Sequence, residues 1–191
     1  MTAMIRPGTT LTDKDILSLL KRLIRRIRSR WENVIMVFRA DSHHTKPAVM
    51  DFLESNGIEH VAGLGPNAVL ERQFEQAAKD ARLKSERTGQ SKARVYASGF
   101  YRAATWSRPR RVICRAEASA AGVDMRFIVT SFEEAGAQYI HGTACCGRGK
   151  MELMIKDHKS ALKSDRTSCN KATANQFRLF LHSGDIFKCC V

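Results

Sequence analysis

The sequence predicts an α/β fold, and three observations support this prediction. Val34–Phe38 is a continuous apolar run of strand length, which is typical of a strand buried on both faces. Residues 94–132 alternate or are rich in β-forming side chains between turn residues, which predicts roughly three antiparallel strands. Residues 13–31 carry apolar side chains at helical spacing. The 191 residues are enough for one domain with a substantial core.

The first expected element is a helix from about residue 13 to 31, opened by the capping box Thr12–Asp15. Its apolar stripe consists of Ile16, Leu19, Leu20, Leu23, Ile24, Ile27 and Trp31. Its other side is basic and contains Lys21, Arg22, Arg25, Arg26, Arg28 and Arg30. A solvated face on a packed helix and a DNA-phosphate contact through Arg25 and Arg26 are both compatible with this pattern. A membrane-surface helix is a minor alternative, because the full stripe is better suited to packing.

The predicted strand Val34–Phe38 leads directly to Asp41, and a helix is expected over about 46–56. An Asp at the carboxyl end of a buried strand lies where open α/β sheets place their ligands. A cap or turn residue is the structural alternative for Asp41. A short strand over 58–64 and a charged helix over 67–87 are expected to follow.

The β-rich region also combines basic and aromatic residues, which hold DNA by phosphate contact and by stacking. A half-exposed sheet produces the same alternation, so both interpretations stay open. The residues concerned are Tyr96, Phe100, Tyr101, Arg102, Trp106, Arg108, Arg110 and Arg111.

A helix is expected over roughly 145–163, where Arg148, Glu152 and Lys159 are spaced to share one stripe. A carboxylate flanked by two cations suits a metal ligand that faces a polyanion, although either cation is equally suited to a helix salt bridge. Met151, Met154, Ile155 and Leu162 occupy the adjoining face. A nearly all-apolar helix is expected over about 172–182, with an irregular tail from Ser183 to Val191.

The bulk composition narrows the function classes. A formal net charge of +13 and a pI near 9.9 indicate a polyanionic partner, with nucleic acid favoured over an anionic membrane. No apolar run approaches about 18 residues and no signal-peptide core follows Met1, so a cytoplasmic protein without membrane contact is expected. The six cysteines form no C-x2-C pair, which argues against a zinc site. A thiol enzyme using Cys145 or Cys146 is a minor alternative.

The segment Cys145-x2-Arg148-x3-Glu152-x6-Lys159 resembles the Y-x2-R-x3-E-x6-K signature of bacterial insertion-sequence transposases with a DDE catalytic triad. Phe38–His43 resembles the strand end that carries the second acidic residue of that triad. Ser164–Cys169 and Ala174–Leu179 resemble the segments that follow the catalytic helix. The resemblance runs from about Arg6 to Leu181, and Cys145 stands where the signature has Tyr.

This resemblance implies that residues 1–191 are the C-terminal portion of a DDE catalytic domain. The implied fold is a partial ribonuclease H-like fold, with a β-rich insertion over roughly 90–135 between the second and third acidic residues. The implied activity is phosphodiester cleavage and strand transfer of an insertion sequence. Its partners would be the ends and target of that DNA together with further copies of the chain, and the protein would be nucleoid-associated when bound.

Asp41 and Glu152 would then be catalytic and would bind Mg²⁺ or Mn²⁺, clamping the attacking and leaving oxygens. The expected nucleic-acid contacts are Arg148, Lys159, Arg25, Arg26, Trp106 and Arg110.

The first Asp of the triad is expected to be missing. Only 40 residues precede Asp41, and the candidates Asp13 and Asp15 occupy a helix start and not the end of a hydrophobic strand. The chain is therefore expected to be a truncated, catalytically incomplete transposase. The alternatives are a non-catalytic basic nucleic-acid-binding protein and a nonfunctional remnant.

Overall fold

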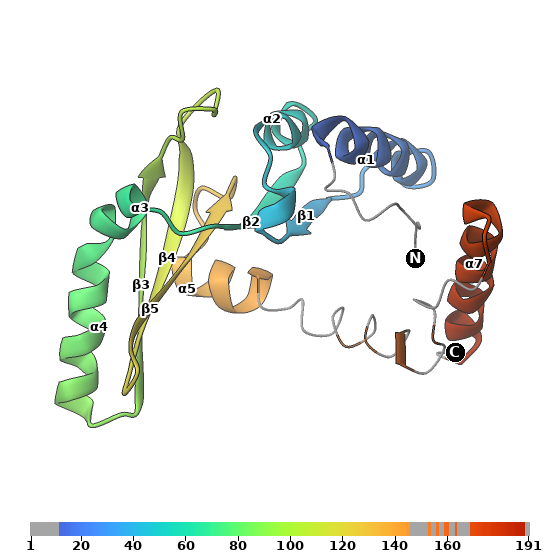
Figure 1. Ribbon diagram of the computed structural model, residues 1–191. Coiled ribbons are helices and arrows are strands. Elements are labelled where there is room, and N and C mark those ends of the chain that lie inside the picture. Colours follow the sequence, from blue (N-terminus) through green and yellow to red (C-terminus); the bar gives the residue numbers. More distant parts are fainter. Residues whose placement is uncertain are drawn as a thin grey trace. The chain divides into compact units, whose positions relative to one another are not determined.

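The computed structural model describes residues 12–145, residues 153, 156, 159–160 and 163, and residues 169–189 (Figure 1). The chain forms two compact units. One comprises Leu11–Cys146, and the other comprises Met1–Thr10 together with Gly147–Val191.

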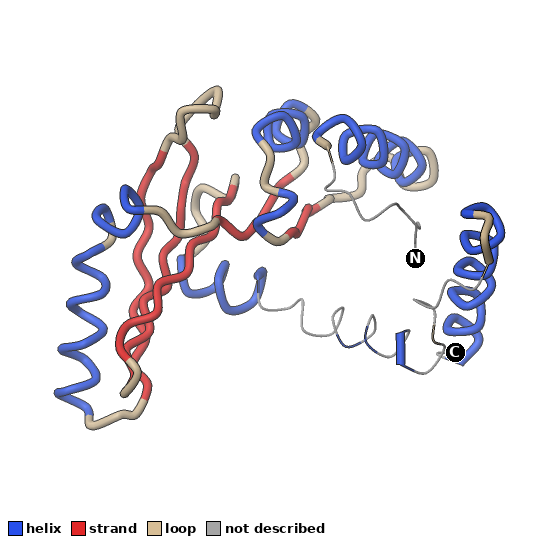
Figure 2. The backbone as a smooth tube through the Cα atoms, in the orientation of Figure 1, coloured by secondary structure: helices blue, strands red, loops and turns tan. Residues whose placement is uncertain are grey.

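The first unit is built on a five-stranded mixed sheet with the order β1-β2-β5-β4-β3 (Figure 2). β1 and β2 are parallel, and every other neighbouring pair is antiparallel. With the helices around it, this sheet confirms the predicted α/β class, and its last three strands are the antiparallel strands predicted from the alternation. The strands are β1 (Val37–Ala40), β2 (Glu59–Leu64), β3 (Lys92–Tyr101), β4 (Arg110–Ser119) and β5 (Gly122–Thr130).

β1 differs from its prediction in both position and burial. The strand begins at Val37, three residues later than expected, and it lies at one edge of the sheet. An edge strand has a neighbour on one side only, so the apolar run before it is not enclosed. Ile35 is 87% exposed, and Val34 and Val37 are 40% exposed. The expectation of a strand buried on both faces was therefore wrong.

α1 (Asp13–Arg28) and α2 (Pro47–Ser55) pack together beside β1. The predicted capping box at Thr12 and Asp15 is present in both directions. α1 ends three residues earlier than predicted, and Trp31, expected on the apolar stripe, is exposed. The shared core consists of Ile16, Ile24, Val49, Leu53 and Ile58.

The single charged helix predicted over 67–87 is divided into α3 (Ala68–Gln73) and α4 (Glu75–Thr88). Phe74 lies at the break, where its buried ring packs 5.9 Å from the ring of Phe127. α4 then covers one face of the sheet through small residues, which are Ala77 and Ala81 against Ala116 and Ala118.

The opposite face of the sheet is partly covered by α5 (Ala137–Tyr139) and the π-helix η2 (Ile140–Cys145). Ile140 packs there against Val61, Ile113 and Ile128. Successive strand residues point to opposite faces, so Ile113 and its neighbours Val112 and Cys114 belong to different cores.

In the second unit, α7 spans Ala172–Cys189. Asn175 secures the segment before it, since its side chain accepts from Cys169 N (3.1 Å) and donates to Cys169 O (2.7 Å). The helix was predicted to end near 182 with an irregular tail, and this was wrong. An established helix continues through a single Gly184 because one glycine costs only about 1 kcal/mol relative to alanine. Among the described residues, no helix is long and apolar enough to cross a membrane.

Candidate functional site

Asp41 lies directly after β1, at the carboxyl ends of the parallel pair β1 and β2. It is the N-cap of the short 3₁₀ helix η1 (Ser42–His44), and its Oδ1 accepts a hydrogen bond from His43 N at 3.1 Å. Asp41 therefore has the capping role that was an open alternative in the sequence. This role does not hide the carboxylate, because the side chain of Asp41 is 42% exposed.

His44 makes a second contact with the same oxygen. Its Nδ1 lies 2.7 Å from Asp41 Oδ1, three residues away along the chain. When the imidazole is neutral, this geometry requires the tautomer in which Nδ1 carries the proton and donates it. Two donors on Oδ1 fix the rotation of the carboxylate. His44 was not among the site residues predicted from the sequence, although its position three residues after Asp41 in a turn was a usable signal.

The backbone of Asp41 is held against β2. Thr45 Oγ1 lies 2.6 Å from Gly63 O and 3.2 Å from Asp41 O, which links the two chain segments. Gly63 permits this close approach, since a Cβ at that position would meet Ser42 N at 3.1 Å and Asp41 C at 3.5 Å. Thr45 and Gly63 were also missed in the sequence, because a close approach between strands leaves no local pattern.

α2, which follows this turn, is joined to the β3–β4 loop and to the first residue of β4 by an ion-pair network. Arg110 donates to Glu54 Oε1 (2.7 Å), to Glu54 Oε2 (2.9 Å) and to Asp51 Oδ1 (2.6 Å). Arg108 pairs with Glu54 at 2.9 Å, and Ser107 Oγ donates to Asp51 at 2.5 Å. The hydrogen bond from Ser107 lowers the pKa of Asp51 most. Burial raises the pKa of Glu54, but Arg110 and Arg108 outweigh it, so this pKa also lies below its ordinary value.

Two residues expected to contact DNA, Trp106 and Arg110, lie inside this unit. Trp106 is 5% exposed and Arg110 is 3% exposed, and the guanidinium of Arg110 lies 5.4 Å from the Trp106 ring centre. Tyr101 packs edge-on against Trp106. Neither Trp106 nor Arg110 is accessible to DNA in this structure, because the ring fills the core and the cation is paired with two carboxylates. Arg111 donates to three backbone carbonyls of the loop 132–135.

His60 is a buried histidine beside the same network. Burial lowers its pKa to about 4, against the opposing charge of Glu54. It is therefore neutral at neutral pH, and its 3.9 Å approach to Glu54 is not an ion pair. Neither ring nitrogen has a hydrogen-bond partner among the described residues.

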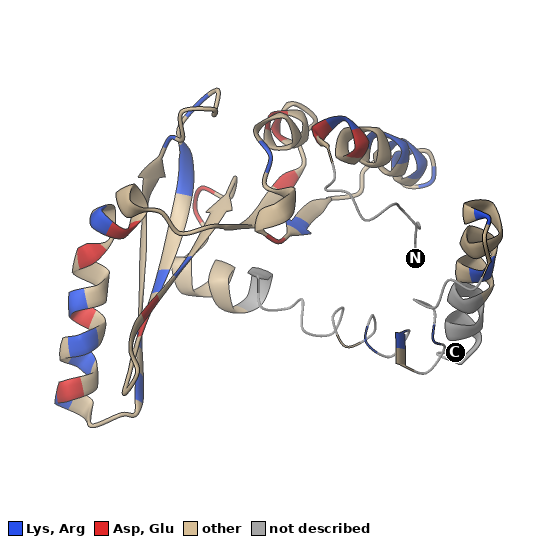
Figure 3. Ribbon diagram, in the orientation of Figure 1, with Lys and Arg blue, Asp and Glu red and all other residues tan. Residues whose placement is uncertain are grey.

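Arg25 and Arg26 lie on the exposed basic side of α1, in its last turns (Figure 3). The acidic residues of this helix, Asp13 and Asp15, belong to its first turn. The cations are therefore separated from the acids along the helix. This arrangement leaves a basic end, compatible with a phosphate contact.

The remaining predicted site residues belong to the second unit. Arg148 and Glu152 lie outside the described residues, and Lys159 is an exposed helical residue. Within the described parts of the chain, no group of three or more His, Cys, Asp or Glu side chains is arranged to hold a metal. Asp41 fits as one ligand, because its side chain is 42% exposed and Mg²⁺ prefers carboxylate oxygens.

The family described as Transposase DDE domain group 1 matches residues 1–186, nearly the whole chain. No curated protein matches this chain.

Proposed function

Because the chain belongs to the family of transposase DDE domains, group 1, we propose that it carries two of the three acidic residues of a site that cleaves and joins DNA phosphodiester bonds during transposition of an insertion sequence. The observation that carries this proposal is the Asp41 carboxylate, which is accessible at a strand end and oriented by His43 and His44. The hydrogen bonds from His43 and His44 do not by themselves require the Asp41 carboxylate to be half-exposed. The carboxylate lies at the edge of the sheet where α/β folds bind their ligands.

Asp41 and Glu152 would supply the carboxylates that hold Mg²⁺ or Mn²⁺. Such ions stabilise the charge on the attacking and leaving oxygens of a phosphodiester. Within the chain, His44 and the amide of His43 keep the Asp41 carboxylate in one orientation. Arg148 and Lys159 would contact the phosphate through charge-assisted hydrogen bonds.

The proposed fold is ribonuclease H-like. It is supported by the parallel pair β1 and β2, with Asp41 at its carboxyl edge. The three antiparallel strands, Lys92–Thr130, would be the β-rich insertion between the second and third acidic residues. The ion pairs from Arg108 and Arg110 to α2 would then hold this insertion against the helix that follows Asp41.

The exposed basic side of α1 would contact the DNA backbone through Arg25 and Arg26. The overall charge of +13 supports an extended polyanionic partner. Self-association on paired DNA ends and a location at the bacterial nucleoid belong to the same proposal.

The proposal is tested by nicking of a supercoiled plasmid in Mg²⁺ or Mn²⁺, measured as conversion to the open circle. Asp41→Asn is expected to lower the rate by about 100-fold or more, since even losing a partner of a metal ligand costs about 10–100-fold. Asp80→Asn, an exposed Asp on α4, is the matched control and is expected to leave the rate unchanged. Equal nicking by wild type and Asp41→Asn would reject the role of Asp41.

A non-catalytic DNA-binding protein is the second candidate function. The observation that favours it is the net charge of +13, which suits a polyanionic partner and requires no metal. This candidate predicts salt-sensitive DNA binding that EDTA does not affect, with no metal-dependent nicking under any condition.

A further inference from the structure

On the sheet face opposite α4, side chains of β3, β4 and β5 form rows that run across the strands. One row across the strands consists of Ser98, Ile113 and Ile128, and the isoleucines are covered by Ile140 of η2. The next two rows lie toward the β4–β5 turn and are polar. They are Tyr96, Arg115 and Arg126, followed by Arg94, Glu117 and Asp124.

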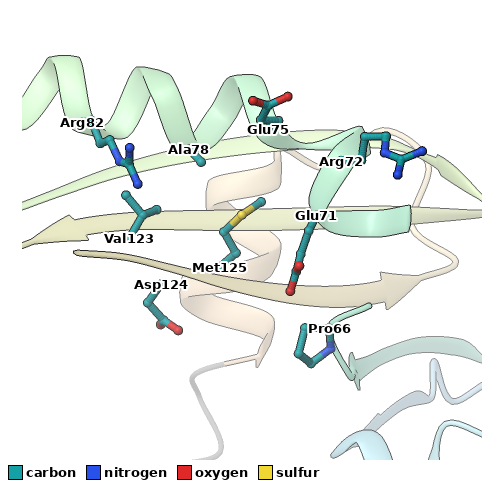
Figure 4. A pocket seen from close by; sticks show the side chains of 9 residues that line it. All are labelled: Pro66, Glu71, Arg72, Glu75, Ala78, Arg82, Val123, Asp124 and Met125. Atoms are coloured by element: carbon teal, nitrogen blue, oxygen red, sulfur yellow. The ribbon is translucent and has the colours of Figure 1, made fainter. Parts of the chain in front are cut away.

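Figure 4 shows this change of face on β5. Val123 and Met125 point toward α4, whereas Asp124 between them points away from it. The alternation of a strand therefore places Arg126 on the same side as Asp124. We call Arg94, Arg115 and Arg126 the arginine face.

The arginine face contains more arginines than carboxylates. Arg94 pairs with Glu117, while Asp124 Oδ2 is shared by Arg115 Nη2 (3.0 Å) and Arg126 Nε (2.9 Å). Arg115 and Arg126 are also direct cross-strand neighbours, an arrangement that repulsion between like charges makes unfavourable by itself. Arg115 Nε is buried and has no hydrogen-bond partner among the described residues.

His141 of η2 lies beside these three cations. Its ring centre is 5.7 Å from that of Tyr96, the neighbour of Arg115. Burial, together with the charges of Arg115, Arg126 and Arg94, lowers the pKa of His141 to about 4. The histidine is therefore neutral at neutral pH and adds no cation to the arginine face.

Two of the three arginines remain accessible. The Arg126 side chain is 67% exposed and that of Arg94 is 51% exposed. The groove on the α4 side is less suited to an anion, because Glu71 and Glu75 line it together with Arg72 and Arg82 (Figure 4). The arginine face therefore has an excess of arginine over carboxylate that the lining of this groove lacks.

We propose that the arginine face binds the phosphate backbone of duplex DNA, with Arg94 and Arg126 making the contacts and Arg115 supporting them from below. In the structure, Asp124 offsets the repulsion between Arg115 and Arg126. A phosphate bound between these guanidiniums would offset this repulsion further. This inference rests on the proposed function in taking DNA as the partner. It names a surface distinct from Asp41 and from the basic side of α1.

The test is fluorescence anisotropy of a labelled DNA duplex of arbitrary sequence, titrated with the full chain in EDTA at several salt concentrations. The double variant Arg94→Gln/Arg126→Gln is expected to bind more weakly and to lower the slope of log K against log salt by about 2. The double variant Arg82→Gln/Arg87→Gln removes the same charge from exposed positions of α4. It is expected to leave that slope near the wild-type value.

A third variant makes the test independent of any loss of folding. Asp124→Asn removes the carboxylate that competes with phosphate for Arg115 and Arg126, so it is expected to tighten binding severalfold. Equal weakening by the two double variants would show binding through net charge alone and would overturn the inference. Unchanged or weaker binding by Asp124→Asn would overturn it as well.

The assay contains no divalent metal, so its outcome is separable from that of the proposed function. Loss of binding in Arg94→Gln/Arg126→Gln without any metal-dependent nicking by wild type would retain the surface and reject the catalysis. Nicking that depends on Asp41, with binding unaffected by the arginine variants, would retain the catalysis and reject the surface.

Discussion

His44 Nδ1 lies 2.7 Å from Asp41 Oδ1, and the two side chains are 37% and 42% exposed. Histidine and carboxylate thus form an oriented pair at the end of an edge strand, beside a turn braced by Thr45. Hydrogen bonding to metal-binding groups commonly fixes their orientation and strengthens metal binding. The proposed metal site therefore depends on a neighbour that the sequence signature does not include.

Replacing His44 is expected to weaken divalent metal binding. His44→Ala removes the donor to Asp41 Oδ1, so the Mn²⁺ dissociation constant, measured by electron paramagnetic resonance, should rise by about 10–100-fold. His44→Asn places an amide NH₂ near the position of Nδ1 and is expected to restore most of the affinity.

His43→Ala is the matched control for His44. His43 contacts Asp41 through its backbone N–H, which the substitution retains. Equal loss of Mn²⁺ affinity in the two alanine variants would contradict a specific role for the His44 side chain.

Gly63→Ala is expected to disturb the Asp41 turn. The added Cβ would lie 3.1 Å from Ser42 N, so the strand or the turn must shift. Overpacking of this kind costs about 1–3 kcal/mol in the free energy of unfolding, which urea denaturation measures. Gly65→Ala provides the comparison, because a Cβ there meets nothing within 4 Å. Similar stabilities of the two variants would show that the approach of Asp41 to β2 is not tight.

Arg110→Met is expected to destabilise the first unit strongly. The guanidinium is buried and holds Glu54 and Asp51, and removing one partner of a buried ion pair typically costs about 3–5 kcal/mol. Arg108→Met removes an exposed cation from the same Glu54 and should cost at most about 1 kcal/mol. The two variants are compared by their free energies of unfolding in urea, and equal losses would reject the dominant role of Arg110.

Acid is expected to destabilise the fold through two buried histidines. Burial lowers the pKa of His60 and that of His141 from 6.5 to about 4. Between these values the unfolded chain binds protons that the folded chain does not, so stability falls as the pH decreases from 6.5 toward 4. Each histidine contributes a slope of up to about 1.4 kcal/mol per pH unit.

His60→Phe is expected to remove about half of this slope, measured by urea unfolding across that pH range. The substitution conserves bulk at a position where neither ring nitrogen has a hydrogen-bond partner among the described residues. An unchanged slope would mean that the pKa of His60 is the same in the folded and unfolded chains.

The sequence predicted the elements with local signals. The capping box at Thr12 marked the start of α1, and alternation marked the three antiparallel strands. Prediction from the sequence failed where contacts between residues distant in the chain decide whether a side chain is buried. Arg110 and Trp106 resemble DNA-binding residues in composition, but Asp51 and Glu54, more than fifty positions earlier, pair with the arginine in the interior.

The candidate site shows the same division. Asp41 was identified from its place after an apolar run, which is a local pattern. Gly63 was not identified from the sequence, because its close approach to Asp41 depends on β1 and β2 lying side by side. The edge position of β1, which exposes Ile35, follows from the strand order and is also invisible in a local pattern.

The most direct test of the central claim is iron-mediated cleavage of the polypeptide. Fe²⁺ in place of Mg²⁺, with ascorbate and peroxide, generates hydroxyl radicals that cut the backbone close to the bound metal. We predict cuts near Asp41 and near Glu152 in the wild type, suppressed at both places by excess Mg²⁺ and lost from both in Asp41→Asn. Cuts elsewhere, or an unchanged pattern in Asp41→Asn, would contradict a metal site built on this carboxylate.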